Sequence, residues 1–178
     1  MSHFTVLVFS RDNIDEMLAP YNENEAVEEY FVEELTIKHK QEFMDYYNEH
    51  YPEESKGKSF SELYELFGER WNGNSYRKNE NDIWCSYSSY NPDSKWDWYE
   101  IGGRWYGEIP NNCCKVNKLP ANFIPFAFID EDGKWHEKGT MGWWAITTNE
   151  KLEEVWETEF REALKGYKGY VTLVDCHI

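Results

Sequence analysis

The sequence predicts an α+β fold: a mainly antiparallel sheet with one packed C-terminal helix and a helical acidic insertion. Three observations lead to this prediction. The chain starts and ends in strongly apolar runs, "HFTVLVF" and "GYVTLVDCHI". Residues 123–139 have the pattern of a β-hairpin, and residues 149–165 have that of an amphipathic helix. With 178 residues, the chain is expected to form a single domain, 1–178, with a mostly helical acidic excursion at about 25–90.

The first elements follow from apolar runs and their boundaries. Residues 3–9 are continuously apolar and β-branched, and polar "SRDN" ends the run, which is typical of a buried strand. Residues 39–51 carry aromatic side chains at helical spacing. Ser59 with Glu62 three positions later forms a capping-box pattern, so a helix is expected to begin there. Residues 71–91 are rich in Asn, Ser and Tyr, which predicts irregular structure.

The C-terminal half alternates strands with one helix. Asp132–Gly133 is a strong hairpin signal between two apolar segments. Residues 142–148, "GWWAITT", are predicted to form a further strand. Thr147 and Glu150 form a second capping-box pattern, which would open a helix ending at Gly166. The first and last strands are both strongly apolar, so we expect them to be central and adjacent.

Composition and charge limit the function classes. Aromatic residues make up 18% of the chain, enough to build a core despite the mean hydropathy of −0.83. The net charge of −16 argues against direct binding of nucleic acid or of an anionic membrane. The four cysteines have no metal-site spacing, and no leader or membrane-spanning run is evident. We therefore expect a soluble cytoplasmic protein with reduced thiols and no cofactor.

The densest cluster of unusual residues is "SKWDWYEIGGRW" at 94–105. Glycine N–H groups and an arginine can hold a phosphate, and indole rings can stack on a base. The candidate ligand-binding residues are Trp96, Trp98, Tyr99, Gly102, Gly103, Arg104 and Trp105. The competing interpretation is a glycine turn anchored by core tryptophans, with Arg104 paired to Asp97 or Glu100.

The acidic region offers an alternative site. Between Asp15 and Glu54 there are thirteen acidic residues and two basic ones. This is either a solvated helical face or a surface that imitates the phosphate spacing of DNA and binds a basic host protein. The residues expected to lie close together on a helix for this purpose are Glu28, Glu29, Glu33 and Glu34.

The C-terminal "VDCHI" gives a third candidate. Asp175 and His177 share one face of the last strand, and His3 could join them if the first strand lies alongside. Two imidazoles and a carboxylate suit metal binding or acid–base chemistry; the competing interpretation is a strand end that frays into solvent. His3-Phe4-Thr5 matches one H-x-T element of two-histidine phosphoesterases, but the second such element is missing. The vicinal Cys113–Cys114 pair has no histidine assigned beside it, so cysteine catalysis is not favoured.

Several blocks together resemble a family of small proteins encoded by tailed phages and prophages. The blocks are "MSHFTVLV", "LAPYNEN", "YNPDSKWDWYEIGGRW", "GKWHEKGTMGWW" and "VTLVDCHI". They cover about half of the chain, outside the acidic excursion. The resemblance implies a phage origin and expression in the bacterial cytoplasm, and it implies no catalytic residues.

The leading functional hypothesis is therefore a phage-encoded protein that binds a small nucleotide-like ligand, such as a host defence signal. The alternatives are an acidic inhibitor of a host nucleic-acid enzyme and a metal-dependent hydrolase that uses His3, Asp175 and His177.

Overall fold

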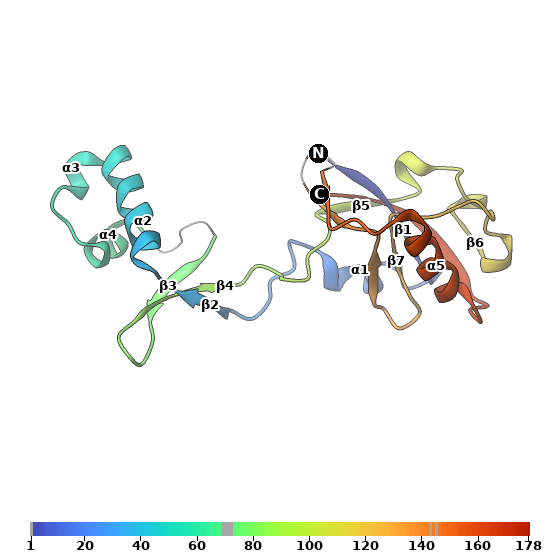
Figure 1. Cartoon of the computed structure of the whole chain (residues 1–178), viewed down its shortest axis with the longest axis horizontal. Helices are drawn as coiled ribbons and strands as arrows, with labels where there is room; N and C mark the ends of the chain where they lie inside the picture. Colours follow the sequence, from blue (N-terminus) through green and yellow to red (C-terminus); the bar gives the residue numbers. More distant parts are fainter. Residues whose placement is uncertain (1, 69–72, 143, 145) are drawn as a thin grey trace. The chain divides into compact units, whose positions relative to one another are not determined.

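The computed structural model describes residues 2–68, 73–142, 144 and 146–178, which form two compact units (Figure 1). Unit 1 comprises residues 1–25 and 91–178, and unit 2 comprises residues 26–90. Unit 2 covers the segment in which the acidic excursion was expected. None of the described helices has the length and apolar character needed to cross a bilayer.

Unit 1 is built on a six-stranded sheet in which β5, β11, β1, β7 and β8 follow one another and β6 also pairs with β11. The strands are β1 His3–Val8, β5 Trp98–Ile101, β6 Cys113–Lys115, β7 Ala127–Ile129, β8 Trp135–Glu137 and β11 Tyr170–His177. All pairings are antiparallel except the parallel one between β1 and β7. The prediction of a mainly antiparallel α+β fold is confirmed.

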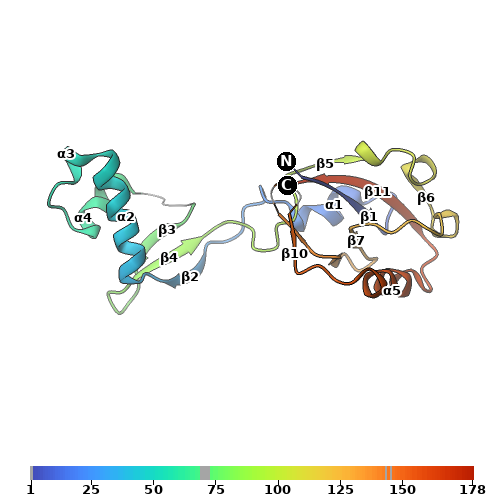
Figure 2. The same ribbon diagram turned by 45° about the horizontal axis from the view of Figure 1, so that its top comes forward.

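The first and last strands are adjacent, as predicted. β1 pairs with β11 along its whole length, from the His3–His177 pair to the Val8–Thr172 pair. β1 is also flanked by β7, so it lies inside the sheet, which explains why its apolar run is continuous. Figure 2 shows the two strands side by side.

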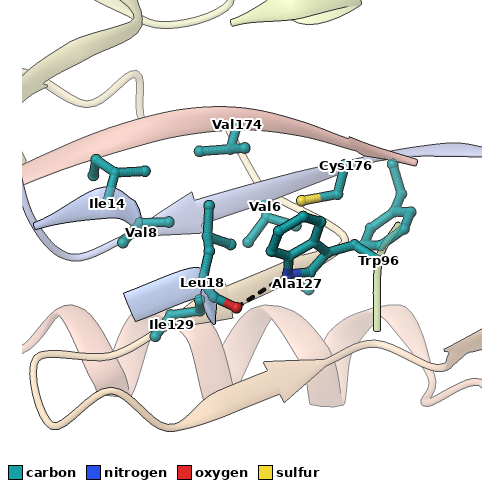
Figure 3. Packing of buried hydrophobic residues seen from close by; sticks show 10 residues of the cluster. Val6, Val8, Ile14, Leu18, Trp96, Ala127, Ile129, Val174 and Cys176 are labelled. Atoms are coloured by element: carbon teal, nitrogen blue, oxygen red, sulfur yellow. Dashed lines mark hydrogen bonds between the residues drawn. The ribbon is translucent and has the colours of Figure 1, made fainter. Parts of the chain in front are cut away.

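Each face of the sheet carries its own core. One face packs on α1 (Ile14–Leu18), with Val6, Val174 and Cys176 among the buried side chains (Figure 3). The other face packs on α5 (Glu153–Leu164), whose Trp156 and Phe160 are fully buried. Alternate residues of β1 and β11 supply the two cores, as the two-residue period of a strand requires.

The C-terminal half confirms two predictions and corrects two. The hairpin around Asp132–Gly133 is present as β7 and β8, and α5 lies on the sheet. The predicted strand over 142–148 is wrong. A short hairpin of β9 (Thr140–Met141) and β10 (Thr147–Thr148) is found instead, because Trp144 has a φ of 64° that interrupts extended structure. Residues 143 and 145 of the predicted strand lie outside the described residues.

The second predicted capping box is also wrong. Thr147 belongs to β10, and α5 begins at Glu153 after Leu152, whose side chain cannot cap. The N–H of Lys151 donates to the carbonyl of Lys138, and the Lys138 ammonium contacts Glu150 and Glu153. These contacts hold the segment before α5 against Lys138.

Unit 2 combines a three-stranded sheet with helices. The strands, in the order β2-β4-β3, are β2 Tyr30–Glu34, β3 Ser75–Lys78 and β4 Trp84–Ser88. The helices are α2 Ile37–His50, α3 Pro52–Ser55 and α4 Phe60–Phe67. Phe43, Phe60 and Leu63 are the centre of its core. The Ser59–Glu62 capping box is confirmed.

Two expectations for unit 2 are corrected. The segment predicted to be irregular over 71–91 contains β3 and β4, and residues 71 and 72 lie outside the described residues. Residues Tyr30–Glu34 form a strand, so the candidate glutamates Glu28, Glu29, Glu33 and Glu34 do not share a helix. Cross-strand pairing with β4 outweighs the local helix preference of glutamate here.

Candidate functional site

On one face of the unit 1 sheet, the side chains become polar at the end of the central strands where His3 and His177 lie. His3, His177 and Trp98 are in register across β1, β11 and β5, and Asp175 lies two residues before His177. Directly paired residues of adjacent strands point to the same face, so all four side chains share the face that α5 covers further along. We call these four residues, with Asp97, the histidine end of the sheet.

The strand ends are held in place by their backbones. The N–H of Ser2 donates to the carbonyl of Ile178 at 3.0 Å, and the N–H of Ile178 donates to the carbonyl of Ser2 at 3.1 Å. This reciprocal pair continues the β1–β11 ladder beyond His3 and His177. The alternative of a frayed C-terminus is therefore wrong.

A buried carboxylate orients His3. Its Nδ1 lies 3.0 Å from Oδ1 of Asp175, whose residue is only 1% exposed. The other carboxylate oxygen, Oδ2, accepts from the backbone N–H of Arg104 at 2.9 Å. Both oxygens of the buried aspartate are thus engaged, as a buried charge requires.

A second carboxylate orients His177. Its Nδ1 lies 2.6 Å from Oδ1 of Asp97, and the N–H of Asp97 donates to the carbonyl of His177 at 3.0 Å. The ring centroids of His3 and His177 are 5.0 Å apart in an edge-to-face arrangement. The site therefore contains two neighbouring His–Asp pairs.

The outer nitrogen of each imidazole is available. Within the described residues, Nε2 of His3 and of His177 has no hydrogen-bond partner, and neither atom is among the buried unpaired ones. Each Nε2 therefore contacts solvent. The Trp98 ring lies 6.3 Å from that of His3 and is 50% exposed, so an exposed indole lies beside the imidazoles.

The Gly-Gly turn fits closely against this site. Gly102 and Gly103 have φ values of 77° and 44°. A Cβ on Gly103 would lie 2.4 Å from Cβ of Asp175, and one on Gly102 would lie 2.4 Å from Nδ2 of Asn112. The N–H of Gly102 donates to Leu173 and that of Arg104 to Asp175, so these two donors are used within the chain.

The predicted aromatic ligand-binding residues are divided among three environments. Trp96 is buried in the core on the α1 side, where its Nε1–H donates to the carbonyl of Leu18 (Figure 3). Tyr99 packs against the same core and bonds to Asp15; burial and this bond raise the Tyr99 pKa to about 12. Trp105 packs in the core on the α5 side. Trp98 alone of the four is in register with the histidines and lies beside His3.

Arg104 is exposed, and its guanidinium has no ion-pair partner among the residues with described positions. The expected pairing with Asp97 or Glu100 is not found, because Asp97 bonds to His177. The backbone N–H of Arg104 donates to Asp175, so the main chain of Arg104 lies next to the histidine end. Glu100, opposite Asp175 on β5, is an exposed negative charge on the same face.

The donor set does not favour a metal. In the described part of the chain, no group of three or more His, Cys, Asp or Glu side chains is arranged to hold a metal ion. Two of the cysteines are also poorly suited to a nucleophilic role. Burial raises the pKa of Cys176 well above its ordinary value and also raises that of Cys114.

The acidic residues proposed as a protein-binding surface lie in unit 2. Glu29 contacts Arg77 and Ser75, and Glu33 lies 3.6 Å from Nδ1 of His39. All four glutamates are exposed. Of the four glutamates, Glu29 is therefore engaged within the chain, whereas Glu33 only approaches an imidazole.

Comparison with family models, curated proteins and solved structures finds no match to this chain. The role of Asp97 was missed from the sequence. No periodic signal could have identified it, because its contact with His177 depends on the register between β5 and β11.

Proposed function

We propose that unit 1 binds a small nucleotide-like ligand carrying one or two phosphates at the histidine end of its sheet. The observation that carries this proposal is the pair of carboxylate-oriented imidazoles, 5.0 Å apart, beside the half-exposed Trp98. Imidazole N–H groups and a guanidinium can donate to phosphate oxygens, and an indole can stack on a base.

We assign each of these groups a role in binding from its position. Trp98 offers its ring to the base, and Nε2 of His3 and His177 contacts the phosphate. Arg104 supplies the positive charge, because Asp175 and Asp97 offset the charge of protonated histidines. Trp96, Tyr99 and Trp105 support the strand and the turn from inside the two cores.

The net charge of −16 favours a ligand that carries few negative charges. A long polyanion meets strong repulsion, whereas a mononucleotide or dinucleotide carries few charges. Because the chain resembles phage proteins, we propose that the ligand is a nucleotide-derived signal of the bacterial host and that binding removes it from circulation. The acidic-inhibitor alternative has less support, since Glu29 pairs with Arg77 and the segment that carries Glu33 and Glu34 is a strand rather than the expected helix.

The test is a thermal-shift panel of mononucleotides, linear dinucleotides and cyclic dinucleotides, followed by calorimetric titration. A ligand at a hundred times its Kd should stabilise the fold by about 2.7 kcal/mol. Trp98→Ala should weaken binding by about 1–3 kcal/mol through lost stacking. His3→Asn, His177→Asn and Arg104→Ala should also weaken binding.

The matched control for the histidine variants is His136→Asn, because His136 also pairs with an aspartate, at 2.7 Å from Asp130, but lies on β8. Arg11→Ala is the matched control for Arg104→Ala, because Arg11 lies beyond the other end of β1 over Tyr170. Both controls should bind normally. A flat panel, or equal effects of site and control variants, would contradict the proposal.

A further inference from the structure

We propose that His3 and His177 form a general acid–base pair that cleaves short ribonucleotide phosphodiesters by attack of the 2′-hydroxyl group. This inference rests on the proposed ligand site and assigns it a substrate class and a reaction. It gives the Nε2 atoms, which contact the phosphate in the proposed complex, a second role as proton acceptor and proton donor.

The orientation of the rings supports catalysis. In each pair a carboxylate accepts from Nδ1–H, so the proton-accepting lone pair of the neutral imidazole is on Nε2, toward solvent. A carboxylate in this position also stabilises the imidazolium that forms when Nε2 takes a proton. Asp175 and Asp97 are thus positioning residues, and His3 and His177 are the catalytic residues.

The separation of the rings suits one phosphoryl group between them. Proton transfer needs heavy-atom distances of about 2.6–3.2 Å from each nitrogen to its oxygen. With centroids 5.0 Å apart and the rings edge to face, the two imidazoles can contact different oxygens of the same phosphate. A single histidine could not serve the entering and the leaving oxygen together.

The reaction is balanced without a co-reactant. One neutral imidazole takes the proton of the 2′-hydroxyl, and the 2′-oxygen forms a new bond to phosphorus. The bond from phosphorus to the 5′-oxygen breaks, and the other imidazole, protonated, donates its proton to that oxygen. The products are a 2′,3′-cyclic phosphate and a 5′-hydroxyl, and proton exchange with water restores the two histidines.

Other features of the molecule agree with a short substrate. The exposed Trp98 can stack on one base next to the scissile phosphate. Glu100 on the same face and the net charge of −16 disfavour a polymer with many phosphates.

The test compares a ribodinucleoside monophosphate, ApA, with its 2′-deoxy counterpart, using the full-length protein and chromatographic product analysis in EDTA. Only ApA should be cleaved, to adenosine 2′,3′-cyclic phosphate and adenosine. His3→Asn and His177→Asn should each lower the rate about 100-fold or more. Asparagine keeps an N–H that can donate to the aspartate while it removes Nε2, and thermal denaturation of each variant verifies folding.

The controls separate the possible failures. His136→Asn should cleave ApA at the unaltered rate, and variants purified in the same way should expose any contaminating ribonuclease. If the deoxy compound binds but ApA is not cleaved, catalysis is refuted and the binding site stands. If neither compound binds nor reacts, both proposals fail. Cleavage of the deoxy compound, or loss of cleavage in EDTA, would overturn the 2′-hydroxyl acid–base mechanism.

Discussion

Asp175 links the turn after β5 to the candidate site. Its carboxylate bonds to Nδ1 of His3 and to the N–H of Arg104, while its Cβ lies against Gly103. Glycine is needed at position 103 for two reasons. Its φ is positive, and any Cβ there would collide with the aspartate. The aspartate in turn fixes the ring of His3. Turn geometry and imidazole orientation are therefore coupled through one residue.

This coupling predicts the effect of Gly103→Ala. The new methyl group would lie 2.4 Å from Cβ of Asp175, in a backbone conformation with a φ of 44°. We expect a loss of about 2–4 kcal/mol in the free energy of unfolding, from backbone strain and overpacking together. Chemical denaturation of the wild-type and variant proteins measures it.

Gly107→Ala is the matched control. Gly107 also has a positive φ, 92°, but an added Cβ would have no neighbour within 4 Å. This variant should show the cost of backbone strain alone, about 1 kcal/mol. Equal losses in the two variants would mean that the contact with Asp175 contributes nothing.

At the level of elements, the sequence predicted well where a strong local signal coincided with burial. The apolar run of β1, the Asp132–Gly133 turn and the Ser59 capping box each lie where expected. The errors arose where tertiary pairing decided the outcome. β2 is a glutamate-containing strand because β4 pairs with it, and Thr147 is drawn into a hairpin with Met141.

The candidate site shows the same dependence on tertiary pairing. The sequence indicated that His3, Asp175 and His177 could meet, because strand adjacency followed from two apolar runs. It could not divide the tryptophans, since their environments depend on where β5 begins. Trp96 and Trp98 are two residues apart, yet Trp96 precedes the strand and is buried while Trp98 within the strand is half exposed.

The observed start of α5 at Glu153 predicts a stabilising substitution. α5 begins after Leu152, which occupies the N-cap position with a non-helical ψ of 143°, has no capping side chain and is 76% exposed. Leu152→Ser supplies an oxygen that can accept from the N–H groups of the first turn. We expect a gain of about 1 kcal/mol relative to Leu152→Ala, which removes the same apolar side chain without adding a cap. Thermal denaturation of the two variants decides it, and equal melting temperatures would mean that no cap forms.

At the level of the whole molecule, unit 2 is an insertion between two segments that together form unit 1. Each unit has its own core, and the N–H of Val27 donates to the carbonyl of Ser89 at 3.4 Å, so the two connecting segments run close together. Replacing residues 26–90 by a short Gly-Ser linker should therefore leave a protein that folds. Its cooperative unfolding transition, followed by tryptophan fluorescence, is the first measurement.

The same variant tests which of the two units carries the function. The histidine end consists only of unit 1 residues, so the shortened protein should bind nucleotides with the affinity of the full chain and cleave ApA at the same rate. The acidic residues Glu28, Glu29, Glu33 and Glu34 are removed with unit 2, so an inhibitor that acts through them should lose its activity completely. A folded unit 1 that no longer binds the ligand of the full chain would assign an essential part of the binding site to unit 2, and the histidine end would then be insufficient.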